Sequence, residues 1–131
     1  MTKAVLEFIN NKLTSQSINY EFGKWNSDIV YPYFVGEYFE TNFDSECGLH
    51  EYDFELQGFS RRGVDSAVGA WEALENAREV IESLFTDCTE ILKNGSGIDI
   101  SYSGSLPIPT GDSELERMQI NLKIKEWKVN A

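Results

Sequence analysis

The stretch that decides the fold is HEYDFELQGF, residues 50–59. His50, Tyr52, Phe54 and Leu56 alternate in it with Glu51, Asp53, Glu55 and Gln57. Because neighbouring side chains of a strand point to opposite faces, this alternation predicts a strand with one face on a core and one in water. Three carboxylates then lie on the water face.

The preceding residues predict the partner of this strand. Residues 29–40 are rich in aromatic and β-branched side chains, which favour strands, and Pro32 places the start of this strand at a sheet edge or a bulge. A polar loop at 41–48 then connects the two strands as an antiparallel hairpin. Upstream, residues 18–28 predict a short strand and a loop, and residues 2–14 predict a helix capped by Thr2.

The following residues predict a long helix. From Val64 to Leu92, apolar residues recur at three- and four-residue steps, with Asp65 and Ser66 as candidate caps and a bend expected near residues 86–87. The stretch Asn94–Gly97 ends this helix. A short strand at 98–102, an irregular loop at 103–113 and a strand at 117–127 complete the chain.

These elements predict a single domain over residues 1–131 of the α+β class. The expected order is α-β-β-α-β-β, with an antiparallel sheet of about four to five strands packed against one long and one short helix. A chain of 131 residues with 41% hydrophobic residues is large enough for one core.

The charge balance narrows the function classes. Eleven Lys and Arg face 22 Asp and Glu, so the net charge is −11. Affinity for nucleic acid and for anionic membranes comes from basic residues, so the composition argues against both as binding partners. No run of about 18 apolar residues exists in the sequence.

The sequence contains no pattern that predicts catalysis, a cofactor or a metal. Its one histidine, His50, lies on the apolar face of a strand, which favours a core or interface histidine. Cys47 and Cys88 are too few for a zinc site or a disulfide framework, so two reduced thiols are expected. Abundant carboxylates leave an acid–base pair open, but their spacing is typical of solvated faces.

Aromatic and basic residues outside the core supply candidates for a protein interface. Three Trp, six Tyr and eight Phe are present, and several fall near loops or strand ends, where aromatic residues can anchor interfaces. Arg61 and Arg62 form a basic spot that could serve as a structural link or pair with an acidic neighbouring chain. The candidate interface residues are Arg61, Arg62, Phe43, Trp25 and Trp127.

The chain resembles the tail terminator, or tail completion, proteins of long-tailed bacteriophages. The resemblance covers nearly the whole chain and rests on element order. A helix at Val5–Leu13 comes first, followed by the Val-Tyr-Pro-Tyr-Phe-Val strand of residues 30–35 and the alternating strand at 50–59. A long helix running out of that strand and a terminal strand complete the pattern.

The resemblance implies a virion protein that forms a ring, usually of six subunits, at the end of the tail. Such a ring caps the tail tube, stops its growth and joins it to the head. It implies as partners the protein itself, the tail tube protein and a head-completion or connector protein, while DNA passes through without specific binding. Two alternatives stay open: another head–tail connector or tail component, and a monomeric acidic binding module.

Overall fold

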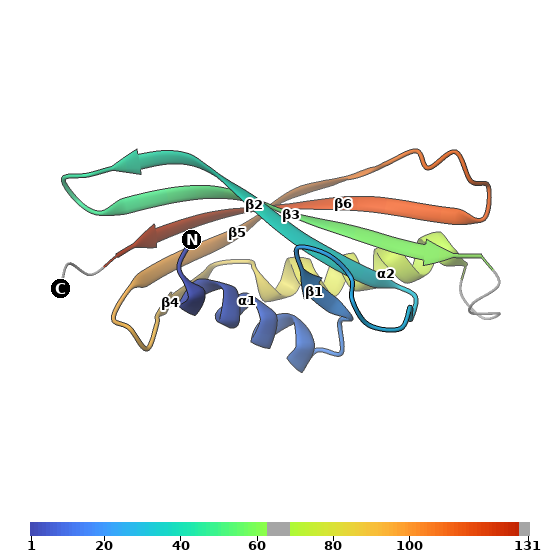
Figure 1. Ribbon diagram of the computed structural model, residues 1–131, viewed down its shortest axis with the longest axis horizontal. Coiled ribbons are helices and arrows are strands. Elements are labelled where there is room, and N and C mark those ends of the chain that lie inside the picture. The colour runs from blue at the N-terminus through green and yellow to red at the C-terminus, as the bar shows by residue number, and fades with distance from the viewer. Residues whose placement is uncertain (63–68, 129–131) are drawn as a thin grey trace.

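The computed structural model describes residues 1–62 and 69–128 and contains two helices and six strands (Figure 1). The elements follow one another as α1 (Lys3–Ser15), β1 (Tyr20–Phe22), β2 (Tyr33–Asp44), β3 (Leu49–Arg61), α2 (Ala70–Leu84), β4 (Cys88–Ile91), β5 (Gly97–Pro107) and β6 (Leu115–Trp127). All strands belong to one sheet with the order β1-β2-β3-β6-β5-β4.

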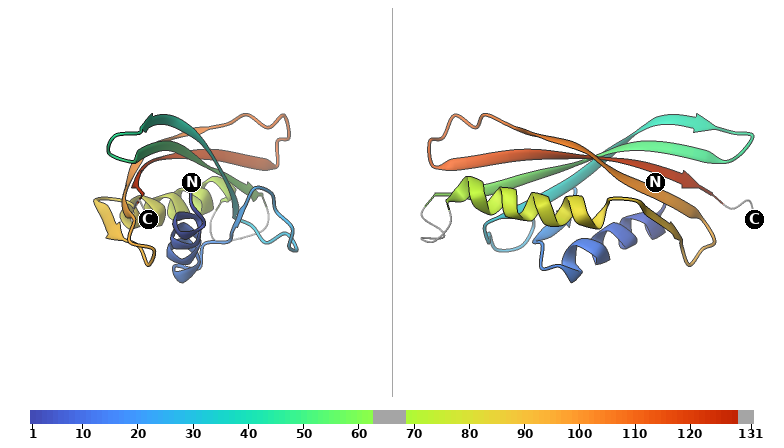
Figure 2. Two further views of the ribbon diagram at one scale, coloured as in Figure 1. Left: turned by 60° about the vertical axis from the view of Figure 1, so that its left-hand side comes forward. Right: turned by 180° about the vertical axis from the view of Figure 1, so that it is seen from behind.

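The sheet is a half-barrel, and this corrects the expected fold class. It has six strands and is mixed, because β1 pairs with β2 in parallel, whereas the prediction was an antiparallel sheet of four to five strands. The predicted order α-β-β-α-β-β is also wrong, because the described elements follow one another as α-β-β-β-α-β-β-β. The centre of the sheet is the antiparallel pair of β3 and β6, which stay in register over their full lengths, from Leu49 opposite Trp127 to Arg61 opposite Leu115. Both helices lie on the same face of this strongly twisted sheet (Figures 1 and 2).

The prediction of one helix from residue 64 to 92 is wrong. Helix α2 ends at Leu84, and Cys88–Ile91 form an edge strand that pairs with β5. The chain turns at Asp87, whose φ of 52° lies in the left-handed region that Asp tolerates better than most residues. Cys88 keeps the apolar spacing of the helix although it lies on a strand. The expected start of the helix at 64–68, with its caps Asp65 and Ser66, lies outside the described residues.

Strands β2 and β5 extend into segments that were predicted to be loops. Strand β2 continues through Asp44, so only residues 45–48 form the turn of the β2–β3 hairpin, and β5 continues through Pro107 into the expected loop at 103–113. At its other end β2 begins at Tyr33 and not at residue 29. Paired backbone groups stabilise these polar extensions where side-chain pattern alone predicts a loop.

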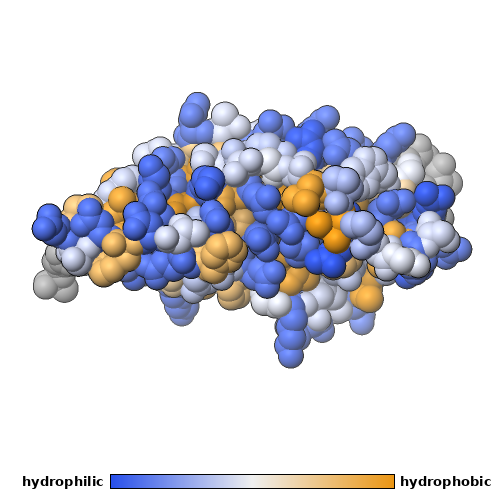
Figure 3. Space-filling view, turned by 90° about the horizontal axis from the view of Figure 1, so that it is seen from above, coloured by the Kyte–Doolittle hydropathy of each residue, from blue (hydrophilic) through white to orange (hydrophobic). Residues whose placement is uncertain are grey.

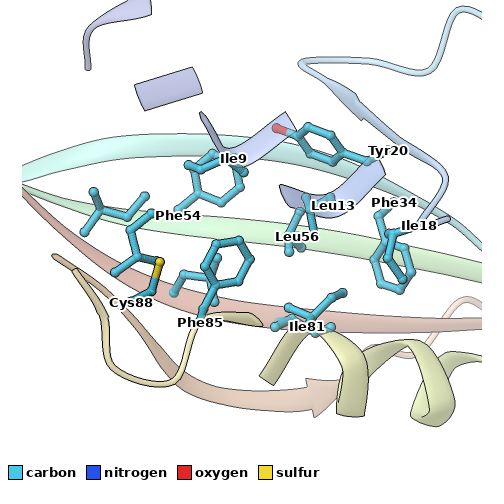
Figure 4. Close-up of a cluster of buried hydrophobic side chains, with 14 of the residues drawn as sticks. Ile9, Leu13, Ile18, Tyr20, Phe34, Phe54, Leu56, Ile81, Phe85 and Cys88 are labelled. Carbon is cyan, nitrogen blue, oxygen red and sulfur yellow. The ribbon is translucent and has the colours of Figure 1, made fainter. Parts of the chain in front are cut away.

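The core lies between the helices and the sheet. Val5, Ile9 and Leu13 of α1 and Leu74 and Ile81 of α2 are fully buried. They face alternate residues of the central strands, which include Phe54, Leu56, Ile120, Leu122 and Ile124. Figure 4 shows part of this cluster, with Phe54 and Leu56 of β3 beside Ile9 and Leu13 of α1. The even-numbered residues of β3 and β6 thus face the helices, as the alternation in the sequence predicts.

Candidate protein interface

Neither α1 nor α2 covers the face of the sheet that is turned away from them (Figures 1 and 2). The odd-numbered residues of β3 and β6 project from it, because the even-numbered ones are buried. We call this surface the open face. Figure 3 views it from above and shows hydrophilic side chains over most of it, interrupted by hydrophobic patches.

An aromatic cluster occupies one end of the open face. Tyr33 stacks on Phe59 across the β2–β3 pair with ring centroids 5.1 Å apart, and Trp25 and Tyr31 pack against Tyr33 at 4.9 and 5.6 Å. All four side chains are half-buried. Burial, together with the neighbouring Tyr31, raises the pKa of Tyr33 above its ordinary value. We call Trp25, Tyr31, Tyr33 and Phe59 the aromatic cluster.

Arg117 extends this cluster with a cation. Its guanidinium lies over the Phe59 ring, 5.3 Å from the centroid, and donates two hydrogen bonds to Oε1 of Gln57, from Nε at 3.2 Å and from Nη2 at 3.0 Å. Gln57 donates in turn to Gln119, which donates to Asn121. Within the described part of the chain no carboxylate pairs with Arg117, so a neutral amide is the acceptor for its charge.

The centre of the open face is less acidic than β3 alone predicts. Lys123 and Lys125 of β6 stand opposite Asp53 and Glu51 in register, with N···O distances of 3.6 and 3.8 Å. The predicted carboxylate row of β3 therefore has a lysine row beside it. These ion pairs are well exposed, so each contributes little to stability.

The β2–β3 hairpin projects beyond the helices at the other end of the sheet (Figure 1). Its end carries Phe43, which is 55% exposed, and the exposed Asp44, Glu46 and Cys47. The turn is shaped by a hydrogen bond from the Glu46 N–H to Asp44 Oδ1 at 2.9 Å and by Gly48 with a φ of 70°. We call residues 43–47 the hairpin tip.

Trp127 lies in an apolar row at the same end of the open face. It stands opposite Leu49 on one side and Gly97 on the other, and Gly97 stands opposite Ile91, the most exposed large hydrophobic residue described. A Cβ atom on Gly97 would lie 3.8 Å from both the Ile91 and the Trp127 side chains, so these side chains flank the glycine. Trp127 and Phe43 are therefore close to one end of the sheet, whereas Trp25 is at the other.

Arg61 and Arg62 do not lie free in a link. Arg61 ends β3 and pairs with Asp112 at 3.4 Å and Glu114 at 3.6 Å, and Arg62 pairs with Glu116 at 3.3 Å. The Glu114 N–H and the Arg61 guanidinium hold the pKa of Asp112 below its ordinary value. Both arginines therefore form ion pairs within the chain, and their role at an interface stays a prediction.

The only histidine lies on the helix-facing side, beyond the start of α1. His50 Nδ1 is 2.9 Å from Glu40 Oε1, and its ring lies between those of Phe43 and Tyr52. The hydroxyl of Tyr52 is buried and has no hydrogen-bond partner in the described residues, and burial raises the Tyr52 pKa above its ordinary value. In residues 1–62 and 69–128, no group of three His, Cys, Asp or Glu is arranged to hold a metal.

Glu126 is the buried charged residue that sequence reasoning missed. It is fully buried, and its carboxylate accepts hydrogen bonds from the Thr2 hydroxyl at 2.6 Å and the Thr2 N–H at 3.4 Å. The expected cap of α1 by the Thr2 side chain is wrong. Thr2 instead connects the start of α1 to β6 through Glu126. A carboxylate at a helix N-terminus also interacts favourably with the helix dipole. The sequence did indicate this burial, because Glu126 continues the series 118, 120, 122 and 124 of an alternating strand and so lies on the same face as these apolar residues.

Comparison with known proteins adds no relative. Neither a scan against protein-family models nor a search of curated proteins finds a match to this chain. Neither helix in the described part of the chain is long and apolar enough to cross a membrane.

Proposed function

We propose that this protein is a structural subunit that assembles into a ring, and that the ring is the terminator of a bacteriophage tail. In this role it caps the tail tube, ends its growth and joins it to the head. Its partners are further copies of itself, the tail tube protein and a head-completion or connector protein, and its location is the virion tail.

The observation that carries the proposal is the exposure of apolar side chains on parts of the sheet that extend past the helices. Phe39 and Phe43 on the β2–β3 hairpin are 52% and 55% exposed, and Ile91 and Trp127 are 74% and 38% exposed near the same end. Exposed apolar groups that gather on a projecting element are typical of surfaces that a protein partner covers. An isolated domain gains nothing from holding them in water.

The charge distribution supports a ring that lets DNA pass. With a net charge of −11 the subunit repels phosphate, and the lysines in the centre of the open face are paired with carboxylates. The resemblance in element order supplies the assignment to a phage tail.

Electron microscopy of the purified protein tests this proposal. We expect closed rings with a central channel wide enough for duplex DNA, and rings added to purified tail tubes should bind at one end only. A gel-shift titration with duplex DNA at physiological salt should show no binding. Particles without a closed ring would refute the terminator function and favour the monomeric binding module.

A further inference from the structure

The two ends of strand β2 carry complementary surfaces. The hairpin tip lies where β2 ends, at Asp44, and the aromatic cluster lies where β2 begins, at Tyr33. Eleven steps of about 3.3 Å separate these residues along the strand, so roughly 36 Å lies between the two surfaces. The tip of one copy therefore cannot reach the aromatic cluster of the same copy.

The hairpin tip presents one apolar ring and two carboxylates. Phe43 is 55% exposed and stands opposite His50, so it projects from the helix-facing side of the hairpin. Asp44 stands opposite Leu49 on the other side, and Glu46 lies in the turn; both carboxylates are exposed. No basic side chain in the described residues forms an ion pair with either carboxylate. The tip is thus an acidic, aromatic projection whose carboxylates form no ion pair within the described residues.

Arg117 and the aromatic cluster present the complementary features. A guanidinium binds a carboxylate through paired N–H donors more strongly than it binds a neutral amide, yet among the described residues Arg117 has only the Gln57 side-chain oxygen as an acceptor. The half-buried rings of Trp25, Tyr33 and Phe59 beside it offer a surface for another aromatic ring. Arg61 and Arg62, at the same end of β3, are already paired within the chain.

We propose that the hairpin tip of one copy docks on the aromatic cluster and Arg117 of the next copy. Phe43 packs on the aromatic rings, and the carboxylates of Asp44 and Glu46 pair with the Arg117 guanidinium. Since each copy carries one tip and one acceptor surface at opposite ends, the contact is head-to-tail, and such contacts close into rings when the rotation between copies allows it. This inference rests on the self-assembly proposed above and names the surfaces that produce it.

Two charge-reversed variants test the contact. The tip variant carries Asp44→Lys and Glu46→Lys, and the acceptor variant carries Arg117→Glu. We expect each alone to raise the concentration needed for assembly at least tenfold in a native mass spectrum. A control with Glu72→Lys and Glu79→Lys, exposed residues of α2, has the same change in net charge as the tip variant and should assemble as the wild type does.

Mixing the two variants gives the decisive result. In the mixture every tip meets an acceptor surface of opposite charge, because the unchanged tip faces the unchanged Arg117 and the lysine tip faces the acceptor of the Arg117→Glu variant. The mixture should therefore assemble into oligomers that alternate the two variants, although neither variant assembles alone. Circular dichroism and thermal melting check that each variant is folded. If Arg117→Glu does not fold, Trp25→Ala, in the loop before β2, is the acceptor variant.

The outcomes separate this inference from the proposed function. If the wild type forms rings and the tip variant forms them equally well, or if the mixture gives no mixed oligomer, the docking is refuted while the ring stands. If the wild type is monomeric at every concentration, both the ring and this contact are refuted. A monomeric wild type whose acceptor surface binds an acidic peptide would identify a foreign partner in place of a second copy.

Discussion

Replacement of Gly58 by Ala tests the register on which the core depends. Gly58 lies on the helix-facing side of β3 opposite Phe34 of β2, and the Phe34 ring lies over it. A Cβ atom on Gly58 would be 2.4 Å from Phe34 Cε1 and 2.9 Å from Cδ1, whereas carbon atoms in contact are about 3.5–4.0 Å apart. Phe34 is 1% exposed and packed into the core, so its ring has no open space to enter.

The expected effect is a clear loss of stability. Overpacking of a core costs about 1–3 kcal/mol, and loss of the conformational freedom of glycine in the unfolded chain offsets about 0.4–1 kcal/mol. We therefore expect Gly58→Ala to lower the free energy of unfolding by about 1–2 kcal/mol and the melting temperature by roughly 4–8 °C. Urea unfolding and thermal melting measure the two quantities.

Two further variants complete this experiment. Gly97→Ala is the matched control, because its Cβ atom would meet its neighbours at the ordinary distance of 3.8 Å, and it should change stability by less than about 0.5 kcal/mol. Phe34→Leu in the Gly58→Ala background should relieve the clash, so the double variant should be less destabilised than the two single effects together. A Gly58→Ala protein as stable as the wild type would show that Phe34 does not lie over this position.

Three other predictions follow from the described contacts. Maleimide should modify the exposed Cys47 within minutes and Cys88 far more slowly, because burial shields the Cys88 thiol and raises its pKa, which lowers the fraction of reactive thiolate. Peptide mass spectrometry measures the two rates, and equal rates would contradict the burial of Cys88. Thr89→Pro should lower the free energy of unfolding by less than about 1 kcal/mol, because the hydrogen bond from the Leu92 N–H to the Ser96 carbonyl places the Thr89 N–H on the unpaired edge of β4. Glu90→Pro should cost clearly more, because the Glu90 N–H points toward β5. A loss of about 3 kcal/mol for Thr89→Pro in urea unfolding would instead favour a helix at this position. Glu126→Ala should cost about 2–3 kcal/mol in the same urea assay, because the half-buried Thr2 hydroxyl loses a charged acceptor and a fully buried side chain is truncated. A neutral effect would show that the Thr2–Glu126 hydrogen bond does not hold α1 to β6.

The sequence predicted the central elements correctly because the apolar residues of each one recur with a single period, that of a strand or that of a helix. Strand β3 and strand β6 alternate strictly, and α1 repeats apolar residues at helical steps, so their types and buried faces are as predicted. The end of α2 was mispredicted because Phe85 and Cys88 fit a helical stripe and a strand equally well. Periodicity is ambiguous for so short a segment, and pairing with β5 decides its structure.

The candidate interface was only partly accessible from sequence for a similar reason. Trp25 and Phe43 were identified from the sequence as candidate interface residues, but their positions at opposite ends of one strand depend on the bounds of β2, which begins and ends four residues later than predicted. Arg117 was not recognised, because its interest comes from the amide that it contacts across the β3–β6 pair. Contacts between residues 60 positions apart leave no trace in a local pattern.

The mass of the protein in solution, measured by native mass spectrometry over a wide range of concentrations, tests the central claim most directly. The account predicts one discrete oligomer, with a mass that is a fixed multiple of 14.9 kDa and does not grow further as the concentration rises. A closed head-to-tail ring leaves no tip or acceptor free, which is why growth should stop. A monomer at all concentrations, or a ladder of ever larger species, would contradict the ring.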